Sequence, residues 1–70
     1  MKPYKEEIKT AILYAAEFSL YGKDDFYDNT NVNFEHTQIE MIKAVDKGDY
    51  EIISDDDPLS AHVLGCKVYF

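Results

Sequence analysis

Only one cysteine occurs among the 70 residues of this chain, which limits how its fold can be held together. A disulfide within the chain is excluded, and so short a chain supports one apolar core, so we expect a single domain over residues 1–70. Burial at this size typically leaves only about 3–5 kcal/mol of net stability. Cys66 lies in an apolar run and is expected to be a reduced, buried thiol, although the sequence leaves its reactivity open.

The composition is that of a folded, acidic protein. Hydrophobic residues make up 46% of the chain, too many for a disordered segment despite a net charge of −7. All seven basic residues are lysine, and the lack of arginine, together with the negative charge, argues against direct binding to nucleic acid. No signal peptide or membrane span fits the sequence, so we expect a soluble, cytoplasmic protein.

A first helix is predicted over residues 4–21. Pro3 suits the start of a helix and Gly22 suits its end. Apolar residues recur at spacings of three and four and predict a buried stripe made of Tyr4, Ile8, Ala11, Ile12, Ala15 and Phe18. This helix would supply a large part of the core.

A second helix is predicted over residues 34–47. Asn33 or Thr37 would cap its start, and the Lys47–Gly48 pair is a typical helix end. Residues 22–33, between the two helices, are rich in Asp and Asn and are expected to form a long loop.

Two strands are predicted near the end of the chain, over residues 49–54 and 65–70. They are expected to pair as an antiparallel hairpin, and residues 58–64 between them could be a short helix or part of a strand. The predicted fold class is α+β, with two helices packed on one face of a small antiparallel hairpin or sheet, in the order α-α-β-β.

Three residue patterns resemble chemical sites but lack essential parts. The spacing of a calcium loop is present at Asn29, Asn31, Asn33 and Glu40, but Phe34 stands where that loop needs glycine. His36, His62 and Cys66 are too few for a zinc site of defined spacing. Cys66 and His62 could form a nucleophilic pair, but nothing near them signals an oxyanion hole. We therefore expect no metal, no cofactor and no enzymatic activity.

The distribution of charge is the most informative feature of the sequence. Residues 24–40 and residues 46–57 each sum to −5, whereas the remaining segments sum to +1 each. If the fold joins the two acidic blocks, it carries a continuous negative surface with aromatic rings among the carboxylates. Clustered charge of this kind accelerates association with a basic partner, while buried aromatic anchors supply the affinity.

The leading hypothesis is a small acidic, non-enzymatic binding protein that inhibits or regulates a basic nucleic-acid-binding host protein, in part by mimicking nucleic acid. The expected partner-binding residues are Asp24, Asp25, Phe26, Tyr27, Asp28, Glu35, Asp49, Tyr50, Glu51, Asp55, Asp56 and Asp57. In size and charge the chain resembles the small inhibitors that phages and mobile elements use against host nucleases, restriction or CRISPR effectors, glycosylases or RNA polymerase. It carries no motif of any one such family.

An alternative hypothesis is a small homo-oligomerising interaction module. Leu13 and Leu20 fall on the polar side of the first predicted helix, and with Tyr21 they could form the interface of a homodimer. The two hypotheses differ in the partner, which is a basic protein in one and a second copy of the chain in the other.

Overall fold

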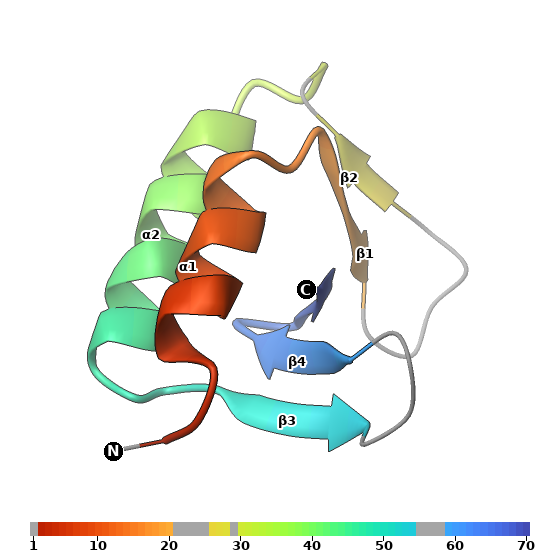
Figure 1. The fold of residues 1–70 in the computed structure, drawn as a ribbon. Helices are drawn as coiled ribbons and strands as arrows, with labels where there is room; N and C mark the ends of the chain where they lie inside the picture. Colours follow the sequence, from red (N-terminus) through yellow and green to blue (C-terminus); the bar gives the residue numbers. More distant parts are fainter. Residues whose placement is uncertain (1, 21–25, 29, 55–58) are drawn as a thin grey trace.

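Two helices lie side by side on one face of an antiparallel sheet (Figure 1). The computed structural model describes residues 2–20, 26–28, 30–54 and 59–70. Within these residues the elements are α1 (Lys5–Leu13), β1 (Glu17–Leu20), β2 (Phe26–Asp28), α2 (Phe34–Asp46), β3 (Glu51–Ser54), β4 (Ser60–Val63) and β5 (Cys66–Tyr69). The sheet has the strand order β2-β1-β5-β4-β3, and every pair of neighbours is antiparallel. The predicted α+β class, with both helices on one face of an antiparallel sheet, is confirmed.

The first helix is shorter than predicted, and α1 ends at Leu13. The chain then continues into two strands, β1 and β2, that precede α2. The end of α1 is stabilised by α2. The side-chain amide of Gln38 donates hydrogen bonds to the carbonyl oxygens of Ile12, at 2.7 Å, and Leu13, at 3.0 Å. The Ile12 carbonyl also accepts a bond from the N–H of Ala15, at 3.3 Å. Carbonyls in the last turn of a helix lack partners within the helix, and Gln38 supplies one. Residues 22–33, predicted to be a loop, include β2.

The second helix agrees closely with its prediction. It covers Phe34–Asp46, and Lys47 is its C-terminal cap residue. Gly48 follows in a left-handed conformation with φ +81°. The N–H of Gly48 donates to the carbonyl of Val45, and the N–H of Asp49 donates to that of Ala44. These two bonds define a Schellman motif, in which glycine avoids the steric cost of positive φ.

The predicted strands β3 and β5 are present, but they do not pair with each other. Strand β4 lies between them and pairs with both, so the alternative of a short helix is wrong for residues 60–63. The turn from β4 to β5 consists of Leu64 and Gly65, whose φ angles are +48° and +82°. Two consecutive positive φ angles are typical of a type I′ hairpin turn.

The core lies between the helix layer and the sheet. Its buried apolar residues are Ile8, Ile12, Phe18, Phe34, Met41, Ala44, Val45, Tyr50, Ala61, Val63, Cys66 and Val68. Phe18 of β1 stacks on Phe34 of α2, with 5.2 Å between the ring centroids, and so anchors β1 to the second helix. In the part of the chain that the structure describes, neither helix has the length and apolar character needed to cross a membrane.

Candidate binding surface

Several of the predicted partner-binding residues lie outside the described residues. These are Asp24, Asp25, Asp55, Asp56 and Asp57. The backbone of Phe26 and Tyr27 belongs to β2, but their side chains also lie outside the described part of the structure.

The described acidic residues of the two blocks do not form one continuous surface. Asp28 lies in β2, at one edge of the sheet, and Glu51 lies in β3, at the opposite edge. Four strand spacings separate the two edges, which amounts to about 19 Å. This is more than twice the screening length of about 8 Å at physiological ionic strength. Glu35 in the first turn of α2 and Asp49 just beyond its last turn are separated by the length of this helix, about 20 Å. Asp28 and Glu51 therefore do not lie side by side, and the expected junction of the two acidic blocks, at Asp55, Asp56 and Asp57, lies outside the described residues.

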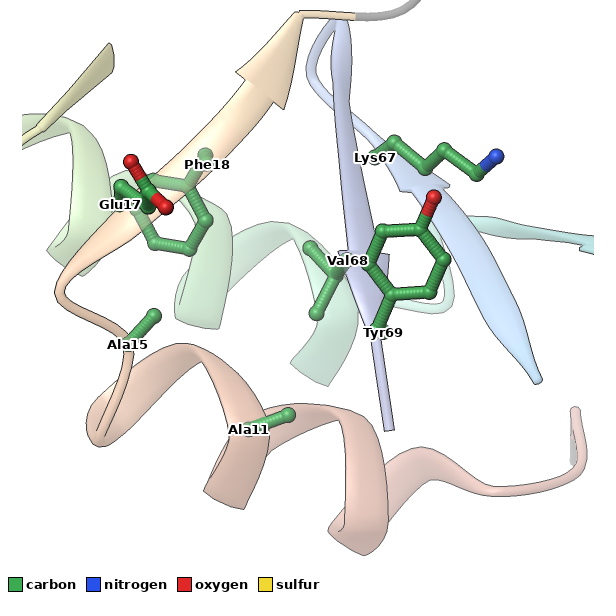
Figure 2. A pocket seen from close by; sticks show the side chains of 7 residues that line it. All are labelled: Ala11, Ala15, Glu17, Phe18, Lys67, Val68 and Tyr69. Carbon is green, nitrogen blue, oxygen red and sulfur yellow. The ribbon is translucent and has the colours of Figure 1, made fainter. Parts of the chain in front are cut away.

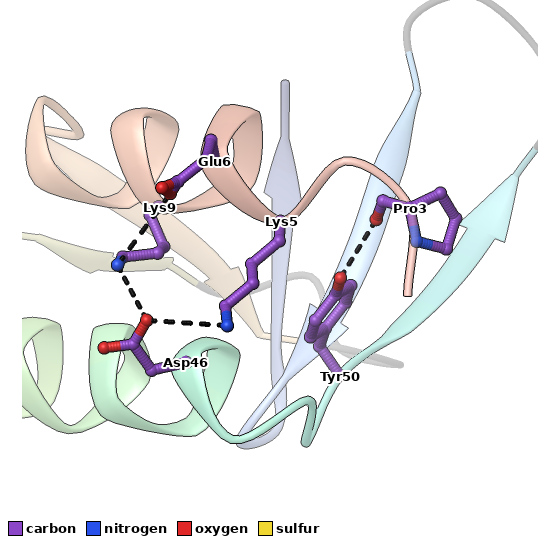
Figure 3. Close-up of polar contacts among 6 residues, drawn as sticks. All are labelled: Pro3, Lys5, Glu6, Lys9, Asp46 and Tyr50. Carbon is purple, nitrogen blue, oxygen red and sulfur yellow. Dashed lines mark hydrogen bonds and ion pairs between the residues drawn. The ribbon is translucent and has the colours of Figure 1, made fainter. Parts of the chain in front are cut away.

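Tyr50 is not an exposed anchor, because only 2% of it is accessible. Its hydroxyl donates a hydrogen bond to the carbonyl oxygen of Pro3 at 3.0 Å (Figure 3). The ammonium of Lys2 donates to the carbonyl oxygen of Tyr50 at 2.6 Å. Burial, with a smaller contribution from the charge of Glu7, raises the pKa of the Tyr50 hydroxyl. The apolar ring is part of the core, and its contacts are structural.

Lysine side chains neutralise three of the acids on the helices, Glu6, Glu40 and Asp46. The Lys9 ammonium lies 2.7 Å from the Asp46 carboxylate and 3.8 Å from that of Glu6 (Figure 3), and Lys43 pairs with Glu40 at 3.6 Å. Among the described residues, a second group of acids has no such ion pair: Glu7, Glu17, Asp28, Glu35, Asp49 and Glu51. All of these except Glu7, which lies on α1, lie on the strands or at the ends of α2.

Glu17 and Asp28 are the most closely associated of these acids. They lie directly opposite each other in the register of β1 and β2. Asp28 accepts hydrogen bonds from the Thr30 hydroxyl and from the Thr30 N–H. These bonds hold the pKa of Asp28 below its usual value, and the bond from the Thr30 hydroxyl has the larger effect. The carboxylate therefore stays charged. Like charges at opposed positions of a strand pair repel each other, and a cation placed between them would relieve this repulsion.

A hollow of about 270 Å³ lies next to Glu17. Strands β1 and β5 pair only at Ser19↔Lys67 and Leu20↔Cys66, and they diverge beyond these pairs (Figure 2). The hollow lies where they diverge and is lined by Ala11, Ala15, Glu17, Phe18, Lys67, Val68 and Tyr69. It is smaller than the roughly 300–1,000 Å³ typical of small-molecule sites, so one side chain of a partner suits it better than a cofactor.

The lining of the hollow is apolar in its interior and charged at its sides. The buried Phe18 and Val68 lie inside, and the small Ala11 and Ala15 leave the space open on the α1 side (Figure 2). The ammonium of Lys67 lies 5.0 Å from the centroid of the Tyr69 ring, on the side away from Glu17. The arrangement can accept a long aliphatic stem and place its cationic end at the Glu17 carboxylate.

Sequence reasoning did not include Glu17, Lys67 or Tyr69 in the site. Glu17 falls within the helix predicted over residues 4–21, although the alternation of polar and apolar residues from Glu17 to Leu20 indicates the strand that the structure shows. Cys66 is buried, and burial raises the pKa of its thiol, which disfavours the reactive thiolate. Within the described residues, no group of three or more His, Cys, Asp or Glu side chains is placed to hold a metal ion.

The geometry defines a small acidic α+β domain with unneutralised carboxylates along its strands. No family model, curated protein or solved structure matches the chain.

Proposed function

We propose that this protein is a small acidic, non-enzymatic binding protein that inhibits or regulates a basic, nucleic-acid-binding protein. The observation that carries the proposal is the opposed pair of Glu17 and Asp28, which has no lysine partner among the described residues and lies beside an apolar hollow. Acids elsewhere on the chain, such as Glu6 and Asp46, are neutralised within the fold. Free carboxylates on a rigid sheet can occupy the lysine and arginine sites with which a protein binds phosphates.

The hollow supplies the part of the affinity that charge alone does not. Exposed ion pairs contribute only about 0.2–1 kcal/mol each, so a tight complex needs at least one buried anchor. In this proposal a lysine or arginine of the partner inserts its methylene groups between Phe18 and Val68 and places its cationic end at Glu17. The ammonium of Lys67, held over the Tyr69 ring, repels other cations. It therefore directs the cationic end of the inserted side chain toward Glu17, on the other side of the hollow.

The proposal is tested by capturing partners from host lysate on the immobilised protein, in the presence and absence of duplex DNA. The expected result is retention of basic, nucleic-acid-binding proteins that are released by the DNA and by high salt, because the competitor occupies the same cationic sites. Retained proteins that are indifferent to both DNA and salt would contradict the proposal.

Variants at Glu17 and Asp28 test whether these two residues contact the captured protein. Replacing both Glu17 and Asp28 by the corresponding amides should weaken binding to the captured protein about threefold to tenfold, as expected for the loss of one to two rim ion pairs. The matched control replaces Glu6 and Glu40 by glutamine, which removes the same charge from the helices. Equal weakening in both double variants would show that only net charge matters.

A further inference from the structure

The surface of the helix layer that faces away from the sheet contains exposed apolar side chains. A groove of about 340 Å³ is lined by Glu6, Lys9, Thr10 and Leu13 of α1 and Ile42 of α2. Leu13 is 56% exposed, and Ile39, one turn before Ile42 on α2, is 46% exposed. We call the surface formed by Leu13, Ile39, Ile42 and the ion pairs around them the helix face. Ile42 is partly buried against the core, so Leu13 and Ile39 supply most of the exposed apolar surface of the helix face.

Most of the charge around the helix face is paired, although the chain carries a net charge of −7. Three lysines and three acids there are in mutual contact: Lys5 and Lys9 with Asp46, Lys9 with Glu6, and Lys43 with Glu40. Glu35, one turn before Ile39 on the same side of α2, adds a single negative charge. Two copies of an acidic chain repel each other over most of their surface. They can approach most closely where the charge of each copy is nearly balanced, as it is around the ion pairs of the helix face.

We infer that the helix face is a self-association surface, on which Leu13, Ile39 and Ile42 pack against the same residues of a second copy. A symmetric pair of copies presents the same patch on both sides, so one apolar cluster is sufficient for the contact. A basic partner is a poorer occupant, because a surface whose charges are nearly balanced offers only a weak field to attract it. The proposed contact for such a partner, at Glu17 and Asp28, lies on strands β1 and β2 and is separate from this surface.

The size of the helix face determines the strength of the contact. Helix α2 has 13 residues and is about 20 Å long, and two helices in contact are together about 20 Å wide. Each copy therefore contributes about 400 Å², and the total of about 800 Å² is below the roughly 1,200 Å² of stable specific interfaces. The dimer is expected to be weak and reversible, with a dissociation constant on the order of 100 µM.

The test is sedimentation equilibrium from low micromolar to millimolar concentration, at low and at high salt. The average mass should rise from 8.1 kDa toward twice that value with concentration. The rise should be larger at high salt, because salt screens the repulsion between two acidic chains. Binding to a basic partner has the opposite salt dependence, so the two proposals can fail separately. A mass that stays at 8.1 kDa under all these conditions overturns the inference.

Two leucines of similar exposure provide a matched pair of variants. Leu13→Lys places a charge on the helix face, at a helix end where a cation is tolerated, and should shift dimerisation to at least tenfold higher concentration. Leu64→Lys changes a residue that is 52% exposed in the β4–β5 turn and should leave dimerisation unchanged. Circular dichroism confirms that both variants fold. Equal dimerisation of the two variants would assign self-association to another surface. The Leu13→Lys variant should still capture the basic partner, because its contact lies on a different surface.

Discussion

Tyr50, immediately before β3, is linked to the segment that precedes α1, because its hydroxyl donates a hydrogen bond to the carbonyl oxygen of Pro3 at 3.0 Å. The Lys2 ammonium donates in return to the carbonyl oxygen of Tyr50, and it lies 5.4 Å from the centroid of the Tyr50 ring. The residue predicted to be a surface anchor thus joins two segments that are 47 positions apart in the sequence.

The first prediction concerns the hydroxyl of Tyr50. Tyr50→Phe keeps the buried ring and removes the bond to Pro3, so the free energy of unfolding should fall by about 1 kcal/mol. Urea denaturation followed by circular dichroism measures the change. The control is Tyr14→Phe, at a position that is 80% exposed, which should stay within about 0.5 kcal/mol of the parent chain. Equal effects at the two positions would mean that the bond to Pro3 contributes nothing.

The second prediction concerns the response of the fold to acid. The hydrogen bond from Lys9, with the nearby charges of Lys9 and Lys5, holds the pKa of Asp46 below its ordinary value of 3.8. The unfolded chain therefore binds a proton at Asp46 more readily than the folded chain does. The stabilisation is present above about pH 4 and is lost as pH falls through the lower folded value. Asp46→Asn should be less stable than the parent at neutral pH, and the difference should shrink in acid. A difference that is the same at pH 7 and at about pH 3 would exclude this linkage.

The elements that sequence reasoning predicted correctly are those with local signals. The α2 helix has an apolar periodicity followed by Lys47–Gly48, and β5 alternates between buried Cys66 and Val68 and the more exposed Lys67 and Tyr69. Each of these signals lies within a few residues of the element that it predicts. The structure therefore reproduces both elements nearly as expected.

Two of the errors occurred where a distant residue determines the local structure. The end of α1 depends on Gln38, which is 25 residues away from Leu13 in the sequence. The role of Glu17 depends on its strand partner Asp28 and on the divergence of β1 from β5. No local pattern carries this information, so the site could be predicted only as an acidic segment and not as a specific pair of carboxylates.

The third prediction concerns the turn that sequence reasoning missed. Leu64 has a φ of +48°, a conformation that β-carbon-bearing residues rarely adopt, and Asn followed by glycine is preferred at this place in a type I′ turn. Leu64→Asn should therefore raise the free energy of unfolding by about 0.5–1 kcal/mol. Leu64→Ala is the control, because alanine keeps the β-carbon and gains none of the local hydrogen bonding of asparagine. Thermal denaturation of the two variants should separate them by about 2–6 °C, and identical midpoints would contradict the assignment of strain to Leu64.

The last prediction concerns a buried hydroxyl at the start of β4. Ser60 is 1% exposed, and its Oγ atom has no hydrogen-bond partner among the residues that the structure describes. A buried polar atom without a partner costs about 1–3 kcal/mol, whereas the methyl group of alanine carries no such cost. Ser60→Ala should therefore stabilise the fold by about 1 kcal/mol, as measured by urea denaturation. The converse variant, Ala61→Ser, places a hydroxyl at a neighbouring residue with 0% exposure and should destabilise it. A loss of stability in Ser60→Ala would mean that the hydroxyl is satisfied in solution, and that this end of β4 depends on a polar contact rather than tolerating an unpaired group.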